Sequence, residues 1–461
     1  MRKVIAFLLI ALSVLSLSAD ELSIKYDKES LYTKMLVNNT SLRNAERDIY
    51  EAHLDTKDAK ANYSPDIDLT VSGTYMTEPM VGNITVSTDE LLSSSGIPTS
   101  TGGYVTLFDG MDNTLYNASL TVTQPINTWG KINLAAKLYE TVEGIQGMKK
   151  TDLERQLSAE LSIRLYLLCY LDQISALISE AESYADELIS IAEVSFKNGV
   201  IIEADYIDAK IQRMDLEVRK SELNSQIEAN LQALRTLTGI TNLKKDEILF
   251  EPEDSILYVY NDYDYQALRE LALSSSNISL QMVNSLKAVH SLQEKIANRS
   301  MYGIPDMALQ VSATYSTPRV PGLEAGWRQN DNFSLNFTFA MQTTLWDGGD
   351  KINDKRRAES SIIRDEISYD EAVLSIDKGL SENYNQMANN LIKLDYLNLS
   401  NNSISLSIKN TELAAKEGQK GRMDLLTSYL KRVENEIEGL MTKAGLSSNV
   451  FMISYLVGDD I

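Results

Sequence analysis

The chain has 461 residues, a mass of 51.5 kDa and a formal net charge of −22 at pH 7. A charge this negative disfavours nucleic acid as a partner, and a mean hydropathy of −0.20 excludes a protein built from membrane-spanning helices. With 8 prolines the chain can form long unbroken helices, and with the single Cys169 it has no internal disulfide framework.

The N-terminus has the pattern of a secretory signal. Arg2 and Lys3 precede an apolar run over 4–17, and the small residues Ser18 and Ala19 follow it. An N-terminal membrane anchor is the alternative, but the run is shorter than the ~20 apolar residues that a spanning helix needs. We therefore expect residues 1–19 to be a cleaved signal peptide and the mature protein to be exported.

The mature chain is predicted to consist of two repeats of the same order of elements, joined by a polar segment over 241–262. The first repeat, 20–240, is predicted to contain a helix over about 29–62, strands over about 65–76 and 116–126, and a helical hairpin over about 130–239. The second repeat, 263–461, is predicted to contain a helix over about 262–300, strands over about 306–316 and 332–346, and a helical hairpin over about 350–457.

Two constant offsets in residue number support the duplication. The segment 65–75 matches 305–315 at seven of eleven positions, at an offset of 240. Further along, an offset of 219 relates Gly130 to Gly349, and it holds as far as Gly239 and Gly458. The difference of 21 residues falls between the two strands, so the first repeat has the longer loop there, over about 76–115.

The strands show apolar residues alternating with small polar ones, which predicts one face in an apolar phase and one in water. The pattern is clearest over 332–342, where Phe333, Leu335 and Phe337 alternate with Ser334 and Asn336. Each strand is close to the ~9–11 residues that a tilted transmembrane strand needs. A soluble sheet with one buried face would show the same alternation.

Four strands are too few to close a barrel, because small barrels need about eight. No other strand-rich region exists to pack against them. Pooling strands from several copies removes the difficulty, and three copies would give twelve.

The second helix of each hairpin has a heptad pattern, typical of a left-handed coiled coil. Each pattern begins soon after a glycine-containing turn, at Gly199 in the first repeat and at Gly418 and Gly421 in the second. Glycine can supply the left-handed conformation that such turns require. The heptad residues, related by the offset of 219, are Ile207, Ile211, Met214 and Val218 in the first repeat and Leu426, Leu430, Val433 and Ile437 in the second.

Together these features resemble the outer-membrane efflux proteins, the TolC-like family. The resemblance covers nearly the whole mature chain and rests on the order and spacing of several short motifs. These motifs are Gln124-Pro-Ile126 before Gly130, Leu345-Trp-Asp-Gly-Gly349, Gly199 through Asp205, Gly418 with Asp424, Leu237-Thr-Gly239 and Leu456-Val-Gly458.

The resemblance implies a mainly α, α+β subunit of a homotrimer in the outer membrane. Twelve pooled strands would form a β-barrel in contact with outer-membrane lipid, and the helices would continue it as a tunnel into the periplasm. The helices outside the hairpins and the segment 241–262 would form an equatorial belt around the middle of the tunnel. The partners implied are a periplasmic adaptor and an inner-membrane transporter, in a tripartite efflux pump or a type I secretion system. No nucleic acid, cofactor or enzymatic activity is implied.

The resemblance also points to gating residues at the hairpin turns. Asp205 and Asp424 match aspartates with which family members narrow the tunnel entrance, and Lys420 lies where some relatives have an arginine. A link from Lys420 to Asp205 is therefore a hypothesis. The family's second aperture aspartate corresponds to Thr427 here, so the ring of charge would be smaller. The alternative is that both aspartates are solvated turn or helix-capping residues.

No set of residues indicates catalysis or metal binding. His53 and His290 stand apart in helices without cysteine partners, which does not make a zinc site. We expect no catalytic, cofactor or metal site. A coiled-coil structural or adhesive envelope protein and a periplasmic enzyme remain as rival readings; the alternating strands disfavour the first and the missing site the second.

Overall fold

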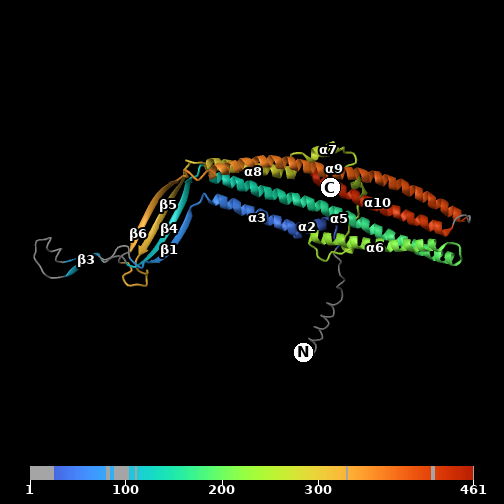
Figure 1. Ribbon diagram of the computed structural model, residues 1–461, viewed down its shortest axis with the longest axis horizontal. Coiled ribbons are helices and arrows are strands. Elements are labelled where there is room, and N and C mark those ends of the chain that lie inside the picture. Colours follow the sequence, from blue (N-terminus) through green and yellow to red (C-terminus); the bar gives the residue numbers. More distant parts are fainter. Residues whose placement is uncertain are drawn as a thin grey trace, which may run out of the picture. The chain divides into compact units, whose positions relative to one another are not determined.

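The computed structural model describes residues 25–78, 84–87, 103–108, 112–328, 331–416 and 421–459; the predicted signal peptide and Lys420 lie outside these ranges. Within them the chain is mainly helical with few strands, which confirms the predicted mainly α, α+β class (Figure 1). The first repeat contains α2 (Lys28–Asn38), α3 (Thr40–Ala61), β1 (Asp66–Tyr75), β2 (Ile84–Ser87), β3 (Tyr104–Phe108), β4 (Thr114–Asn127), α5 (Lys131–Lys197) and α6 (Glu203–Thr238). The 3₁₀ helices η1 (Lys245–Glu247) and η2 (Asp254–Tyr258) follow, and then α7 (Tyr265–Ala272), α8 (Ile278–Arg299), β5 (Asp306–Thr317), β6 (Asn332–Gln342), α9 (Asp350–Lys416) and α10 (Arg422–Val457).

The chain divides into two compact units that do not coincide with the two sequence repeats. One unit comprises the described residues of 25–51, 144–286 and 364–459, and it holds most of the helical hairpins. The other comprises 52–143 and 287–363, and it holds the sheet with the adjoining helix ends. Each unit therefore draws on both repeats.

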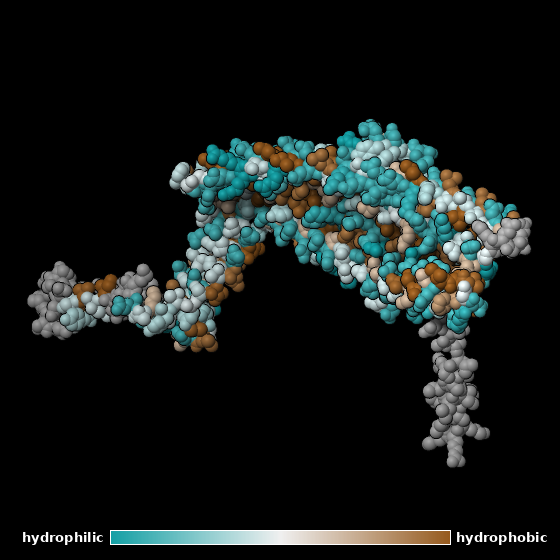
Figure 2. Space-filling model, turned by 45° about the vertical axis from the view of Figure 1, so that its right-hand side comes forward, coloured by the Kyte–Doolittle hydropathy of each residue, from teal (hydrophilic) through white to brown (hydrophobic). Residues whose placement is uncertain are grey.

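The sheet unit contains one four-stranded antiparallel sheet in the order β1-β4-β5-β6 (Figure 1). Strand β4 of the first repeat pairs with β5 of the second, with Leu120 opposite Ala313 and Val122 opposite Val311. The alternating apolar side chains that the sequence predicted are largely exposed in the single chain, as at Val71 and Phe337. Figure 2 shows such hydrophobic residues on the surface of the sheet.

The long loop of the first repeat contains a feature that the sequence pattern did not predict. Strands β2 and β3 form a separate two-stranded antiparallel sheet within it, with Val86 opposite Val105. Their alternation is too short to be recognised against the polar sequence around them.

The helices before the strands are interrupted, where the sequence predicted one continuous helix over 29–62 and another over 262–300. The breaks lie at Asn39 and Asn277, which precede α3 and α8. Each asparagine accepts hydrogen bonds at Oδ1 from two backbone amides of the helix that follows, and so caps it.

The same two asparagines also hold the ends of the hairpins. Asn39 Nδ2 donates to the carbonyl of Leu237 at 3.0 Å, and Asn277 Nδ2 donates to the carbonyl of Leu456 at 3.3 Å. Leu237 and Leu456 are related by the repeat offset of 219. In each repeat an asparagine therefore links the last turn of the hairpin to the start of the helix that precedes the strands.

Helix α5 is the central helix of the helical unit. It has 67 residues, about 100 Å at 1.5 Å per residue, and its apolar residues enter clusters with both α6 and α10. One stretch of α5 is long and apolar enough to cross a membrane by length and composition, but half of it is buried within the protein. Burial between two neighbouring helices accounts for that composition.

A cluster of aromatic rings fills the centre of the helical unit. Tyr166 of α5 makes edge contacts with Phe250 and Phe451, at 5.1 and 5.2 Å between ring centroids. Tyr170 is buried beside it. The segment between the repeats, predicted as a polar linker, thus packs the partly buried Phe250 against two of the core clusters.

Candidate functional site

The turn of the first hairpin has the glycine conformation that the sequence predicted. Helix α5 ends at Lys197, and Gly199 adopts a φ of +69°, the left-handed conformation that favours glycine. The amide of Val200 donates to the carbonyl of Ser195 at 2.8 Å and closes the turn. In the second hairpin Gly418 and Lys420 lie outside the described residues, and Gly421 has a φ of −82°, which does not require glycine.

The two candidate aperture aspartates occupy equivalent places. Asp205 lies in the first turn of α6 and Asp424 in the first turn of α10, and both side chains are exposed. A carboxylate there interacts favourably with the helix dipole. Among the described residues neither carboxylate takes part in a hydrogen bond or ion pair. The predicted partner of Asp205, Lys420, is outside the described residues, so their link stays a prediction.

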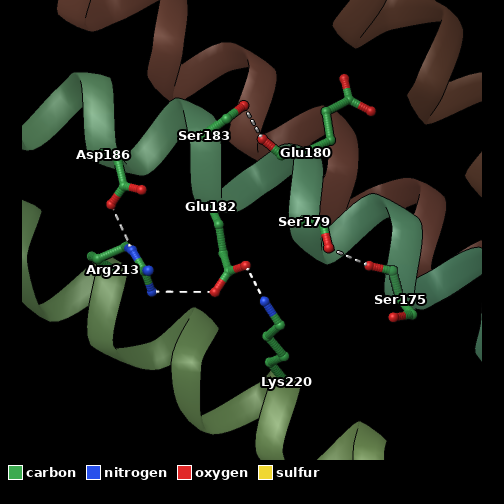
Figure 3. A network of polar contacts seen from close by, with 8 residues as sticks. All are labelled: Ser175, Ser179, Glu180, Glu182, Ser183, Asp186, Arg213 and Lys220. Carbon is green, nitrogen blue, oxygen red and sulfur yellow. Dashed lines mark hydrogen bonds and ion pairs between the residues drawn. The ribbon is translucent and has the colours of Figure 1, made fainter.

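Next to the tip, the first hairpin is held by a charged network between α5 and α6 (Figure 3). Arg213 of α6 donates to Asp186 at 2.7 Å and lies 3.4 Å from Glu182, and Lys220 donates to the other oxygen of Glu182 at 2.6 Å. These bonds fix α6 along α5.

The two hairpins are joined near their tips by a bidentate ion pair. Arg422, the first residue of α10, donates from Nε and an Nη to both carboxylate oxygens of Glu187 on α5, at 2.8 and 3.0 Å. The hydrogen bonds from Arg422 hold the pKa of Glu187 below its usual value. Both side chains are exposed, so the link is individually weak and open to disruption.

Ten residues further along α10 and seven residues back along α5, a second contact joins the same helices. Arg432 donates to Glu180 at 2.8 Å, and the hydroxyl of Tyr184 donates to the same carboxylate at 2.6 Å. The rings of Tyr184 and Tyr429 stack between the two ion pairs, with centroids 5.1 Å apart. The hydrogen bond to Glu180 raises the pKa of Tyr184.

Sequence reasoning did not identify these links, although one signal was present. Glu180 and Glu187 are seven residues apart on α5, so they lie on one stripe of a heptad pattern beside the apolar seam. Charged residues at such positions form interhelical ion pairs. Their partners on α10 could be matched only once the relative positions of the hairpins were known.

The histidine and cysteine residues that could bind a metal ion or act as a nucleophile make contacts within the structure. Within the described ranges no three of His, Cys, Asp and Glu are grouped so as to hold a metal ion. His53 Nδ1 lies 2.9 Å from Glu143, between two helices of the sheet unit. Cys169 donates to the carbonyl of Phe250 at 3.1 Å, and burial raises the pKa of its thiol to about 11, which leaves it a protonated, poor nucleophile.

Comparison with solved structures shows one fold along nearly the whole chain. A membrane protein of Pseudomonas aeruginosa is 14% identical with a TM-score of 0.73, over 94% of this chain and 90% of that chain. The outer membrane protein VceC of Vibrio cholerae is 15% identical with a TM-score of 0.69, over 94% and 96%. The outer membrane channel CmeC of Campylobacter jejuni is 13% identical with a TM-score of 0.68, over 94% and 85%. No curated protein sequence gives a match.

A family model gives the direct sequence relation. Residues 31–240 match the model described as outer membrane efflux protein, which is a channel family and not an enzyme family. These residues make up most of the predicted first repeat, and α9 and α10 repeat α5 and α6 at an offset of 219. The first repeat therefore matches the outer membrane efflux protein family, and nearly the whole chain has the fold of the solved TolC-like outer membrane channels.

Proposed function

We propose that the channel is a homotrimer in which three four-stranded sheets close into one twelve-stranded barrel. The observation that carries the proposal is the pairing of β4 with β5. Strand β4 is the second strand of the first repeat, and β5 is the first strand of the second repeat. Strand β6 is again a second strand and β1 again a first strand, and they are the two edges of the sheet. Pairing β6 with β1 of another copy continues the same rule until the sheet closes.

The chemistry of the edges and faces supports closure in a membrane. Open edge strands leave rows of backbone amides and carbonyls without partners, which lipid cannot satisfy. The exposed apolar side chains, such as Leu69, Val71 and Phe337, would face lipid. Twelve strands enclose a water-filled lumen wider than eight would. The conduit would be passive, with docking to a periplasmic adaptor and an inner-membrane transporter supplying cargo and energy.

The assembly is tested on protein purified from the outer-membrane fraction. We expect a heat-modifiable oligomer, which runs at three times the monomer mass on an unheated gel and as a monomer after boiling, and which conducts ions in a planar bilayer. A water-soluble monomer that produces no conductance would overturn the proposal. A non-conducting oligomer in the envelope would instead favour a structural envelope protein.

We further propose that Asp205, Asp424 and Lys420 line the narrow periplasmic entrance. The support is the equivalent placement of the two aspartates in the first turns of α6 and α10, directly after the hairpin turns. Exposed carboxylates repeated by the symmetry of a ring would concentrate cations at the entrance.

The aperture assignment predicts a change in cation block. The variants Asp205→Asn, Asp424→Asn and Lys420→Ala are compared in single-channel recordings with Asp208→Asn, an exposed aspartate one turn further along α6. We expect Asp205→Asn and Asp424→Asn to lose block by divalent cations, because they remove negative charge from the constriction. Lys420→Ala, which removes a positive charge, and Asp208→Asn, which lies outside the constriction, should keep it. Equal block and equal conductance in all variants would remove both aspartates from the aperture.

A further inference from the structure

In the sheet unit, helices α8 and α9 lie side by side (Figure 1), with a groove of about 330 Å³ between them. The apolar part of its lining consists of Ile296 and Ala297 of α8 and the buried Ala358 of α9. The polar part includes Lys351 and Arg357, which both lie in the first turns of α9. The groove therefore presents apolar surface and two cations at the same place.

The cationic lining of the groove is a feature of the second repeat alone. The offset of 219 places Ile132 and Leu138 of the first repeat where the second repeat has Lys351 and Arg357. Further basic residues neighbour the groove-lining ones in sequence, although the whole chain has a net charge of −22; they are Lys295 and Arg299 on α8 and Lys355 and Arg356 on α9. Repetition of the fold does not require these cations, because the first repeat forms the same helices without the two that line the groove.

Several of these cations are available to a ligand. Lys295 and Arg356 are exposed, and neither takes part in a hydrogen bond or ion pair within the part of the chain that the structure describes. Arg357 donates to Asp354 at 2.5 Å, but both side chains of this pair are exposed, and a guanidinium has five N–H groups. The pair therefore leaves donors of Arg357 free to bond an anion.

Large apolar side chains are exposed in the connections between the strands and these helices. Leu345 and Trp346, between β6 and α9, are 80% and 77% exposed. Trp129, between β4 and α5, is also exposed, and its indole N–H donates to the carbonyl of Pro305 at 2.7 Å. In the proposed barrel these connections would lie at the level of the lipid headgroups, where tryptophan is enriched.

We infer that the groove between α8 and α9 binds the headgroup of an anionic phospholipid in the periplasmic leaflet of the outer membrane. The inference rests on the proposed barrel, which sets the depth of the groove, and it adds a specific ligand. Lys351 and Arg357 would bond the phosphate, and the apolar lining would contact the first carbons of the acyl chains. A free phosphate ion would leave that apolar lining uncovered, so the groove fits an amphiphile better.

The expected selectivity follows from the charge of the lipid. A basic side chain near a membrane surface increases the affinity for anionic lipid by about fivefold. Two such side chains line the groove, so a lipid with a net negative charge should bind at least tenfold more tightly than a neutral one. The bound headgroup would hold the subunit at one depth in the membrane, because the groove lies beside the helix ends that join the strands.

Native mass spectrometry of the full-length, delipidated protein tests the ligand. The protein is titrated with short-chain phosphatidylglycerol, with phosphatidylcholine of the same chain length, and with inorganic phosphate. We expect phosphatidylglycerol to bind at least tenfold more tightly than phosphatidylcholine. Equal affinity for the two lipids would overturn the inference, and displacement of phosphatidylglycerol by an equal concentration of inorganic phosphate would overturn the assignment to a lipid.

Two double variants test the place of binding. Lys351→Gln with Arg357→Gln should abolish most of the preference for phosphatidylglycerol, whereas Lys378→Gln with Lys409→Gln, which removes two exposed charges of α9 outside the groove, should leave it unchanged. The groove variant should fold, because Arg357 is 71% exposed and Lys351 lies over the ring of Tyr302 without a core contact. A preference that survives in the groove variant would overturn the site.

The same preparations are assayed for conductance in a planar bilayer. A conducting oligomer that shows no preference for the anionic lipid would overturn this inference and leave the proposed function standing. A water-soluble monomer without conductance would overturn both.

Discussion

At the residue scale, the contact that joins the tips of the two hairpins is a bidentate pair between exposed side chains, Arg422 and Glu187. Surface ion pairs are weak and are screened by salt. A weak link would suit the periplasmic entrance that we propose, which would open when a partner docks. The charged network of Arg213 and Glu182 lies within one hairpin, so it can persist while the hairpins separate.

The pair predicts a pH-dependent loosening of the tip. The folded-state pKa of Glu187 is lowered by Arg422, so the link is present at neutral pH and is lost as pH falls from the ordinary glutamate pKa of about 4.3 through the lowered value. We expect Glu187→Gln to accelerate amide hydrogen exchange over 423–430 severalfold at pH 7 and little at the acidic end of this range.

The control for this measurement is Glu193→Gln. Glu193 also has a lowered pKa, but its partner Lys197 lies on the same helix, so its loss should leave exchange in α10 unchanged. If the Glu187 and Glu193 variants exchange alike, the pair does not join the hairpins functionally.

At the element scale, the ends of the hairpins are fixed by a glycine and an asparagine in each repeat. Gly239 and Gly458 end α6 and α10 with φ of +69° and +77°. Asn38 packs tightly against Gly239, because a Cβ atom added to Gly239 would lie only 2.6 Å from Cβ of Asn38. Around Gly458 the nearest atom is the flexible end of Arg155, at 3.4 Å. The two equivalent glycines thus differ in the space that each leaves for a side chain.

This inequality gives a prediction within one chain. Gly458→Ala should lower the free energy of unfolding by about 1–2 kcal/mol, the usual cost of a left-handed conformation for a residue with a Cβ. Gly239→Ala should cost more, because the backbone near Asn38 must also move. Thermal unfolding of the two variants measures the difference. A smaller loss for Gly239→Ala than for Gly458→Ala would contradict the packing described here.

At the scale of the whole molecule, the two sequence repeats and the two compact units have different boundaries. The offset between the repeats predicts which residues occupy equivalent structural positions. The compact units cut across the repeats because α3, α5, α8 and α9 each begin in one unit and end in the other. The assembly that we propose would follow from the repeat, because the strand pairing that joins the first repeat to the second would also join the second repeat to the next copy.

The sequence by itself determined the order of elements, the strands and the long hairpins. These depend on local periodicity, which alternates over 332–342 and has a heptad spacing from Leu426 onward, and periodicity can be read without knowing any neighbour. The same reasoning missed the breaks at Asn39 and Asn277. An asparagine inside a helical pattern acts as a cap only if the chain bends there, and the bend depends on contacts about 180 to 200 residues away.

Only the tertiary structure decided which of two identical patterns is covered. The stripes beginning at Ile207 and Leu426 are both apolar in sequence, yet every member of the first is exposed, whereas Leu426 and Val433 of the second are buried. It also placed Glu187 against Arg422, which are 235 residues apart. Burial and ion pairing are properties of two surfaces in contact, and a sequence pattern describes one surface at a time.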